Sequence, residues 1–119
     1  MIRLVFAEPA ERDLEDILTW IARENPAAAR KVFDEIVATT QRLTVFPDLG
    51  RAGRLPDTRE CPVRSLPFVI TYQRTDATIT VLAVFHGARN LPAALQARRE
   101  ELARPDTTDR RTETKKDES

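Results

Sequence analysis

The stretch PAERDLEDILTWIARENPAAARKVFDEIVATTQRLTVF, residues 9–46, decides the fold because it predicts two amphipathic helices separated by a short break. In its first half, up to residue 24, apolar residues recur at the spacing of one helical face: Leu14, Ile17, Leu18 and Ile21. Asn25 and Pro26 then interrupt the pattern, and they suit the cap and the first turn of a new helix. The second half carries its own apolar stripe, so the sequence predicts a helical hairpin with two faces that must be buried.

Runs of β-forming residues on both sides of this hairpin predict the sheet that buries it. Residues 2–7 predict a first strand. Residues 68–72 and 78–85, joined through residues 74–77, predict a strand hairpin. The second strand of this hairpin is apolar on both faces, which is typical of a strand covered on both sides.

A weaker strand is predicted at residues 59–66, because Pro62 cannot donate a ladder hydrogen bond and belongs at an edge or a bulge. With it, the order becomes strand, helix, helix and then an antiparallel meander. The predicted fold class is therefore α+β, a two-layer sandwich of helices on a sheet.

The C-terminal part is predicted to be less firmly structured than the rest. Pro92 can begin a last helix, whose apolar stripe of Leu91, Leu95 and Leu102 is thin, which leaves open how firmly it docks. After Pro105 no apolar residue follows, so we expect a flexible, disordered tail. The sequence thus predicts a domain at residues 1–91, a C-terminal helix at 92–104 and a tail at 105–119.

The composition excludes several classes of protein. The chain has 19 basic and 19 acidic residues, so its net charge does not indicate a nucleic-acid partner. One cysteine and one histidine cannot form an internal disulfide or supply the ligands of a zinc site, and we expect no metal and no cofactor. Without an apolar run near 18 residues or a secretory signal, we expect a cytoplasmic protein with no membrane partner.

The basic residues are unevenly distributed along the chain. Residues 51–89 carry six basic and three acidic side chains, and all six basic ones are arginines: Arg51, Arg54, Arg59, Arg64, Arg74 and Arg89. Arginine suits carboxylates, phosphates and protein contacts alike. Two interpretations stay open, a binding surface and an ordinary solvated face with ion pairs.

Four motifs together resemble the ParE branch of the RelE/ParE toxin superfamily: DLEDI and WI on the first helix, FPDLGR at residues 46–51, FVITY at 68–72 and HGARN at 86–90. The similarity covers residues 2–91. It implies the toxin of a type II toxin–antitoxin system, of the plasmid-stabilisation kind, neutralised by a cognate antitoxin in a hetero-oligomer. It also implies one of two activities: inhibition of DNA gyrase, or cleavage of messenger RNA on the ribosome.

The residues themselves favour the first activity. Cleaving RNA through its 2′-hydroxyl requires a base, an acid and a cation. His86 is the candidate proton carrier, and Arg64, Arg74 and Arg89 are expected to approach it at one end of the sheet. Tyr72, the candidate acid, alternates with core residues, and the lysine and arginine cluster of the RNA-cleaving branch is missing. We therefore expect no catalytic residue, with His86, Arg64 and Arg89 as the alternative set.

A toxin that inhibits gyrase by binding needs contact residues rather than catalytic ones. Trp20 lies at the margin of the first helical stripe, where it either closes the core edge or anchors a partner, and Cys61 is expected to be a buried small hydrophobe. The residues predicted to contact the target or the antitoxin are Trp20, Arg51, Arg54, Arg59, Arg64, Arg74, His86, Arg89 and Asn90. A non-toxic regulatory relative is a third alternative.

Overall fold

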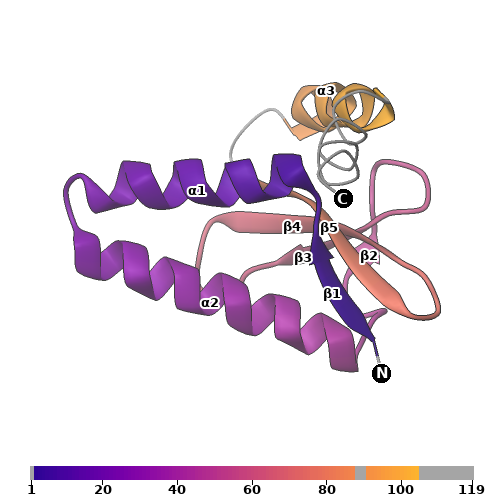
Figure 1. Cartoon of the computed structure of the whole chain (residues 1–119), viewed down its shortest axis with the longest axis horizontal. Helices are drawn as coiled ribbons and strands as arrows, with labels where there is room; N and C mark the ends of the chain where they lie inside the picture. The colour runs from indigo at the N-terminus through magenta and orange to yellow at the C-terminus, as the bar shows by residue number, and fades with distance from the viewer. Residues whose placement is uncertain (1, 88–90, 105–119) are drawn as a thin grey trace, which may run out of the picture.

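The computed structural model describes residues 2–87 and 91–104 and confirms the predicted α+β fold (Figure 1). Its elements are β1 (Arg3–Phe6), α1 (Glu8–Ala22), α2 (Pro26–Val45), β2 (Arg51–Ala52), β3 (Arg59–Pro62), β4 (Phe68–Arg74), β5 (Thr78–His86) and α3 (Leu91–Ala103). The predicted tail at residues 105–119 lies outside the described residues. None of the described helices combines the length and the apolar character that crossing a bilayer requires.

The helical hairpin begins and ends where the sequence predicts. The side chain of Asn25 accepts a hydrogen bond from the Ala28 N–H at 3.0 Å, and Pro26 occupies the first turn of α2. This cap satisfies one of the N–H groups that a helix start leaves unpaired. α2 ends at Val45, because Pro47 cannot continue the helix. Its 20 residues run antiparallel to α1 along the sheet (Figure 1).

The sheet is mixed, with strand order β1-β5-β4-β3-β2. β1 pairs with β5 in parallel, and the other neighbours are antiparallel. Pro62 pairs with Val69 on one side, while β2 extends along β3 only as far as Glu60. Pro62 therefore lies where β3 forms the sheet edge, as the sequence predicts, because its missing N–H is needed by no neighbouring strand.

Both faces of β5 are covered, which explains its continuous apolar sequence. Val81 and Val84 pack with the core that α1 and α2 close, whereas Ala83 and Phe85 pack with Leu95 of α3. A register shift between Thr71 and Tyr72 allows each of these two groups of β5 residues to stay on its own face of the sheet. In the ladder Thr71 pairs with Ala83 and Tyr72 with Val81, so Leu82 has no register partner on β4.

Candidate binding surfaces

The strand hairpin divides the predicted site residues between two ends of the sheet. His86 pairs with Phe68 at one end of the β4–β5 ladder, and Arg74 pairs with Ile79 at the other. Six steps along β4 separate these positions, a distance of about 20 Å. The expectation that Arg74 approaches His86 is therefore wrong. β4 and β5 run antiparallel, so the end of β4 that carries Arg74 pairs with the start of β5, whereas His86 lies at the end of β5. Arg64, in the loop before β4, lies toward the His86 end.

Arg59 and Arg74 share one carboxylate at the other end of the sheet. Arg59 lies 3.4 Å and Arg74 3.1 Å from Asp48 Oδ1. Arg59 also donates to the Gly50 carbonyl at 2.7 Å, so it holds the loop between α2 and β2. Part of the basic excess between residues 51 and 89 is therefore used in ion pairs that shape this loop.

Glu60 organises the neighbouring arginines although its side chain is only 2% exposed. Its Oε2 accepts a hydrogen bond from the Arg54 backbone N–H at 3.0 Å, and its Oε1 lies 3.7 Å from Arg51. The Arg51 side chain itself is 70% exposed and can still reach a partner. Arg89 and Asn90, also predicted as contact residues, lie outside the described residues.

Tyr72 is a core residue whose hydroxyl is used in structural contacts. The side chain is fully buried, and its hydroxyl donates to the Pro47 carbonyl at 2.7 Å and accepts from the Gly50 N–H at 3.0 Å. Burial raises the pKa of Tyr72, and the hydrogen bond from Gly50 only partly opposes that increase. The prediction that Tyr72 belongs to the core is confirmed, and its phenol joins the sheet to the loop after α2.

His86 is exposed at the end of β5, with its ring edge-on to Phe68 at 5.6 Å between centroids. Tyr72 lies four residues along β4 from the register partner of His86, about 13 Å at the rise of a strand. The two candidate proton carriers therefore occupy different parts of the sheet.

A groove of about 720 Å³ opens at the His86 end of the molecule. Ile17, Trp20 and Ile21 of α1 line one side, and the opposite side is formed by α2 and the segment that leads into β4. The Trp20 side chain is 71% exposed, so it does not close the core edge. The walls are mostly apolar, with Asp16 and His86 among the polar members.

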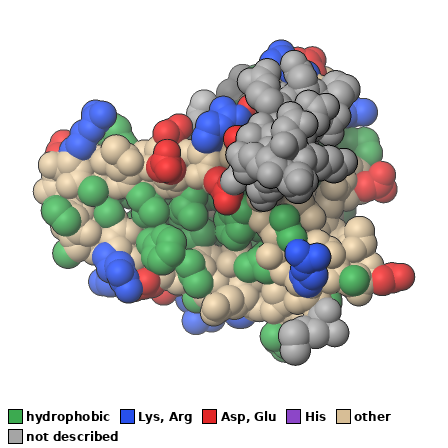
Figure 2. Space-filling view, in the orientation of Figure 1, with side chains coloured by type: hydrophobic (Ala, Val, Ile, Leu, Met, Phe, Trp, Pro, Cys, Tyr) green, Lys and Arg blue, Asp and Glu red, His purple; other side chains and the backbone are tan. Residues whose placement is uncertain are grey.

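Apolar surface also extends along the helical hairpin. Figure 2 shows hydrophobic side chains gathered in the seam between α1 and α2 on the face in view. Phe33 of α2 is among the exposed large hydrophobic residues, with 36% of its surface accessible. Phe33 does not line the groove beside Trp20, and a single exposed aromatic ring is ordinary on a protein surface.

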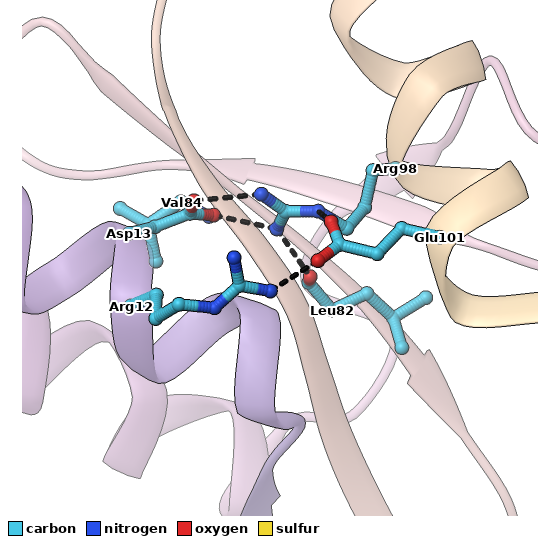
Figure 3. A network of polar contacts seen from close by, with 6 residues as sticks. All are labelled: Arg12, Asp13, Leu82, Val84, Arg98 and Glu101. Carbon is cyan, nitrogen blue, oxygen red and sulfur yellow. Dashed lines mark hydrogen bonds and ion pairs between the residues drawn. The ribbon is translucent and has the colours of Figure 1, made fainter. Parts of the chain in front are cut away.

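A polar network that the sequence did not predict joins α1, β5 and α3 (Figure 3). Arg98 of α3 reaches Asp13 of α1 with two hydrogen bonds of 2.7 Å, and it donates to the Leu82 carbonyl at 3.0 Å. Leu82 has no register partner on β4, so Arg98 satisfies a carbonyl at this irregularity of the sheet. The Arg98 guanidinium also lies 5.2 Å from the centre of the Phe85 ring. Arg12 pairs with Glu101 beside it.

Cys61 lies in the core, as predicted, and is 4% exposed. Burial raises the pKa of its thiol, while the charge of Arg42 acts weakly in the opposite direction. Across residues 2–87 and 91–104, no three His, Cys, Asp or Glu side chains gather in a way that could hold a metal ion.

Comparisons with known proteins agree with this architecture. The model of the ParE toxin family, from the type II toxin–antitoxin system parDE, matches residues 4–91. Protein Y4kP of Sinorhizobium fredii is 33% identical over 72% of this chain and 88% of its own length. Toxin RelE1 of Caulobacter vibrioides is 30% identical over 66% of this chain and 85% of its own length.

The fold itself is shared with a solved structure. A chain of the chromosomal ParDE toxin–antitoxin system from P. aeruginosa superposes with a TM-score of 0.65 at 22% sequence identity. The superposition covers 72% of this chain and 96% of the other. Because the family model spans β1 to the start of α3, the chain belongs to the ParE toxin family of type II toxin–antitoxin systems.

Proposed function

We propose that this toxin acts by binding DNA gyrase in the cytoplasm and that a cognate antitoxin silences it in a hetero-oligomer. The proposal that the toxin binds gyrase, rather than cleaving RNA, rests on the separation of Tyr72 and His86, the two side chains that could transfer protons. The Tyr72 hydroxyl is held between Pro47 and Gly50, and the position of Tyr72 on β4 is about 13 Å along the sheet from the register partner of His86.

That separation opposes RNA cleavage by these two side chains. An acid and a base acting on one phosphodiester must both reach the same reacting group within hydrogen-bond distance. Arg64 could supply a cation near His86, so cleavage with His86, Arg64 and Arg89 is the alternative that the experiment must separate. Binding a protein target requires no such arrangement, and the exposed apolar surfaces support it.

The groove beside Trp20 supports antitoxin binding. Tryptophan contributes a large apolar surface, and exposed tryptophans are frequent hot spots of protein interfaces. Ile17 and Ile21 continue the apolar wall along α1, at a spacing that an apolar partner segment could follow. We infer that an apolar segment of the antitoxin fills this groove and covers Trp20.

Inducible expression without antitoxin tests the target. Separate pulse labels of DNA, RNA and protein synthesis then show which process stops first. DNA synthesis that fails first, with induction of the DNA-damage response, is the expected result. An immediate arrest of translation would support the nuclease instead. A His86→Ala variant is expected to keep full toxicity, and loss of toxicity with intact folding would also favour the nuclease.

Calorimetric titration with the product of the neighbouring antitoxin gene tests the groove. Trp20→Ala is expected to weaken the complex by about 2 kcal/mol, or about 30-fold in Kd. The control is Phe33→Ala, because Phe33 is an exposed aromatic residue that does not line the groove. Equal losses of antitoxin affinity for the two variants, or no loss for Trp20→Ala, would show that the antitoxin does not bind in this groove.

A further inference from the structure

A second exposed apolar surface lies where α2 ends. Val45, Phe46 and Leu49 have exposed fractions of 67%, 59% and 50%. The Leu49 N–H donates to the Phe46 carbonyl at 3.0 Å, so a tight turn holds the backbone of these residues together. Three large apolar side chains are thus presented to solvent within five consecutive residues, where they add little to the core.

This turn is held in place by the buried Tyr72 and by two partly exposed arginines. The Tyr72 hydroxyl bonds both Pro47 and Gly50, and Arg59 donates to the Gly50 carbonyl at 2.7 Å. Arg74 adds a contact of 3.1 Å to Asp48 within the turn. A surface that is already ordered loses less conformational entropy when it associates, so this loop is preorganised for binding.

The charges around the turn favour an acidic partner. Arg51 follows the turn in the sequence, and Arg59 and Arg74 contact Asp48 within it, with side chains 70%, 36% and 37% exposed. Two carboxylates oppose these three arginines: Asp48, which Arg59 and Arg74 share, and the buried Glu60, which lies 3.7 Å from Arg51. One positive charge remains in excess. An apolar centre with arginines around it is typical of protein hot spots. A nucleic-acid backbone would use the arginines and leave the apolar centre without a contact.

We propose that this surface binds an acidic, partly apolar surface on the protein target of the toxin. We call it the α2–β2 patch, and it consists of Val45, Phe46, Leu49, Arg51, Arg59 and Arg74. The inference rests on the proposed function and adds that the target and the antitoxin meet different surfaces. Val32 lines the groove and Val45 begins the patch, and the 13 helical steps between them span about 20 Å. In Figure 1 the turn between α1 and α2 and the C-terminal end of α2 lie at opposite ends of the hairpin.

Two variants of the full chain test the patch. The double variant Phe46→Ser, Leu49→Ser removes the apolar centre, and Arg51→Gln removes an exposed charge that does not hold the turn. Phe33→Ser and Arg23→Gln are the matched controls, because they change an exposed aromatic residue and an exposed arginine elsewhere. Circular dichroism and thermal melting establish that each variant is folded.

The readouts are growth arrest without antitoxin, binding to purified gyrase and binding to the antitoxin. We expect the double variant to bind gyrase at least 30-fold more weakly and to lose toxicity, with antitoxin affinity within twofold of the unchanged toxin. Arg51→Gln is expected to slow association with gyrase and to reduce its salt dependence. The two controls are expected to behave like the unchanged toxin.

Other outcomes separate this inference from the proposed function. Unchanged toxicity of the folded double variant, or an equal loss of antitoxin affinity, overturns the inference and leaves gyrase as the target. If the unchanged toxin does not bind gyrase but the double variant still loses toxicity, gyrase is wrong and the patch is supported. An unchanged toxin that is harmless without antitoxin overturns both.

Discussion

Arg98 of α3 and Asp13 of α1, which are 85 residues apart in the chain, form an ion pair with two hydrogen bonds of 2.7 Å. Their side chains are 11% and 14% exposed, so solvent screens this pair only weakly. The same Asp13 carboxylate accepts the Val84 N–H at 2.9 Å. One carboxylate therefore ties α1, β5 and α3 together (Figure 3).

Replacing Asp13 by alanine is expected to lower the free energy of unfolding by about 2–4 kcal/mol, because it removes both hydrogen bonds of a largely buried ion pair and leaves the Val84 N–H without its acceptor. Arg98 keeps its contacts with Glu101 and the Leu82 carbonyl, which do not replace the lost pair. Urea denaturation measures the change, and hydrogen exchange is expected to rise in α3. Asp16→Ala is the control, since Asp16 is an exposed carboxylate one turn away on α1. A change below about 0.5 kcal/mol for Asp13→Ala would mean that the ion pair does not hold α3.

The docking of α3 is expected to weaken in acid. Burial alone would raise the pKa of Glu101, but hydrogen bonds and charges from Arg12 and Arg98 outweigh it and lower the pKa below its ordinary value of 4.5. The ionised carboxylate therefore stabilises the folded state at pH values above 4.5, and this contribution is lost as the pH falls through the lowered pKa.

Urea denaturation between pH 3 and 7 compares the unchanged chain with Glu101→Gln to test this dependence. The stability difference between the two proteins is expected to be largest at neutral pH and to shrink in acid. A difference that stays constant across this range would show that Glu101 does not contribute to the pH dependence.

Gly50→Ala is expected to destabilise the protein by about 1–3 kcal/mol, because an added methyl group overpacks the turn after α2. A Cβ at this position would lie 2.8 Å from the Glu60 carbonyl and 2.9 Å from the Tyr72 ring, and the backbone carbonyl cannot turn aside. Gly87→Ala is the control, because its Cβ would approach no closer than 3.4 Å, to the Pro67 carbonyl. Equal melting temperatures for the two variants would contradict the close packing at Gly50.

The Cys61 thiol is expected to react slowly with iodoacetamide in the native protein at pH 8. Its burial raises the thiol pKa and blocks access, and the thiolate is the reactive form. Mass spectrometry over time is expected to show that Cys61 is modified as fast as a thiol in an unfolded chain only when denaturant is present. Rapid native labelling would indicate that β3 opens readily at the sheet edge.

Most elements of this fold could be predicted from the sequence because each carries its own signal, whereas the two-residue strand β2 was not predicted. The periods of the two apolar stripes place α1 and α2, and Asn25 with Pro26 marks the start of the second helix. Pro62 indicates where β3 lacks a neighbour, since it has no N–H to donate. The burial of Tyr72 and Cys61 follows in the same way, from alternation within a strand and from residue type.

Other features were decided by the tertiary structure alone. Trp20 lies at the margin of an apolar stripe, and only the packing of α1 on the sheet left it exposed. The six arginines between residues 51 and 89 look like one group in the sequence, but the direction of β4 carries Arg74 away from His86. Leu91, Leu95 and Leu102 predict only a thin apolar stripe for docking the last helix. The ion pair between Asp13 and Arg98 adds a contact that attaches this helix to α1.

The difference between the features that could be predicted and those that could not comes from the distance along the chain over which each interaction acts. Periodicity, capping and proline chemistry act over a few residues, so the sequence by itself determined the helices, the strands other than β2 and the sides they bury. Strand register, the parallel pairing of β1 with β5 and the meeting of Asp13 with Arg98 depend on contacts between distant segments. Those contacts exist only once the chain has packed, so the tertiary structure decided where the binding surfaces lie.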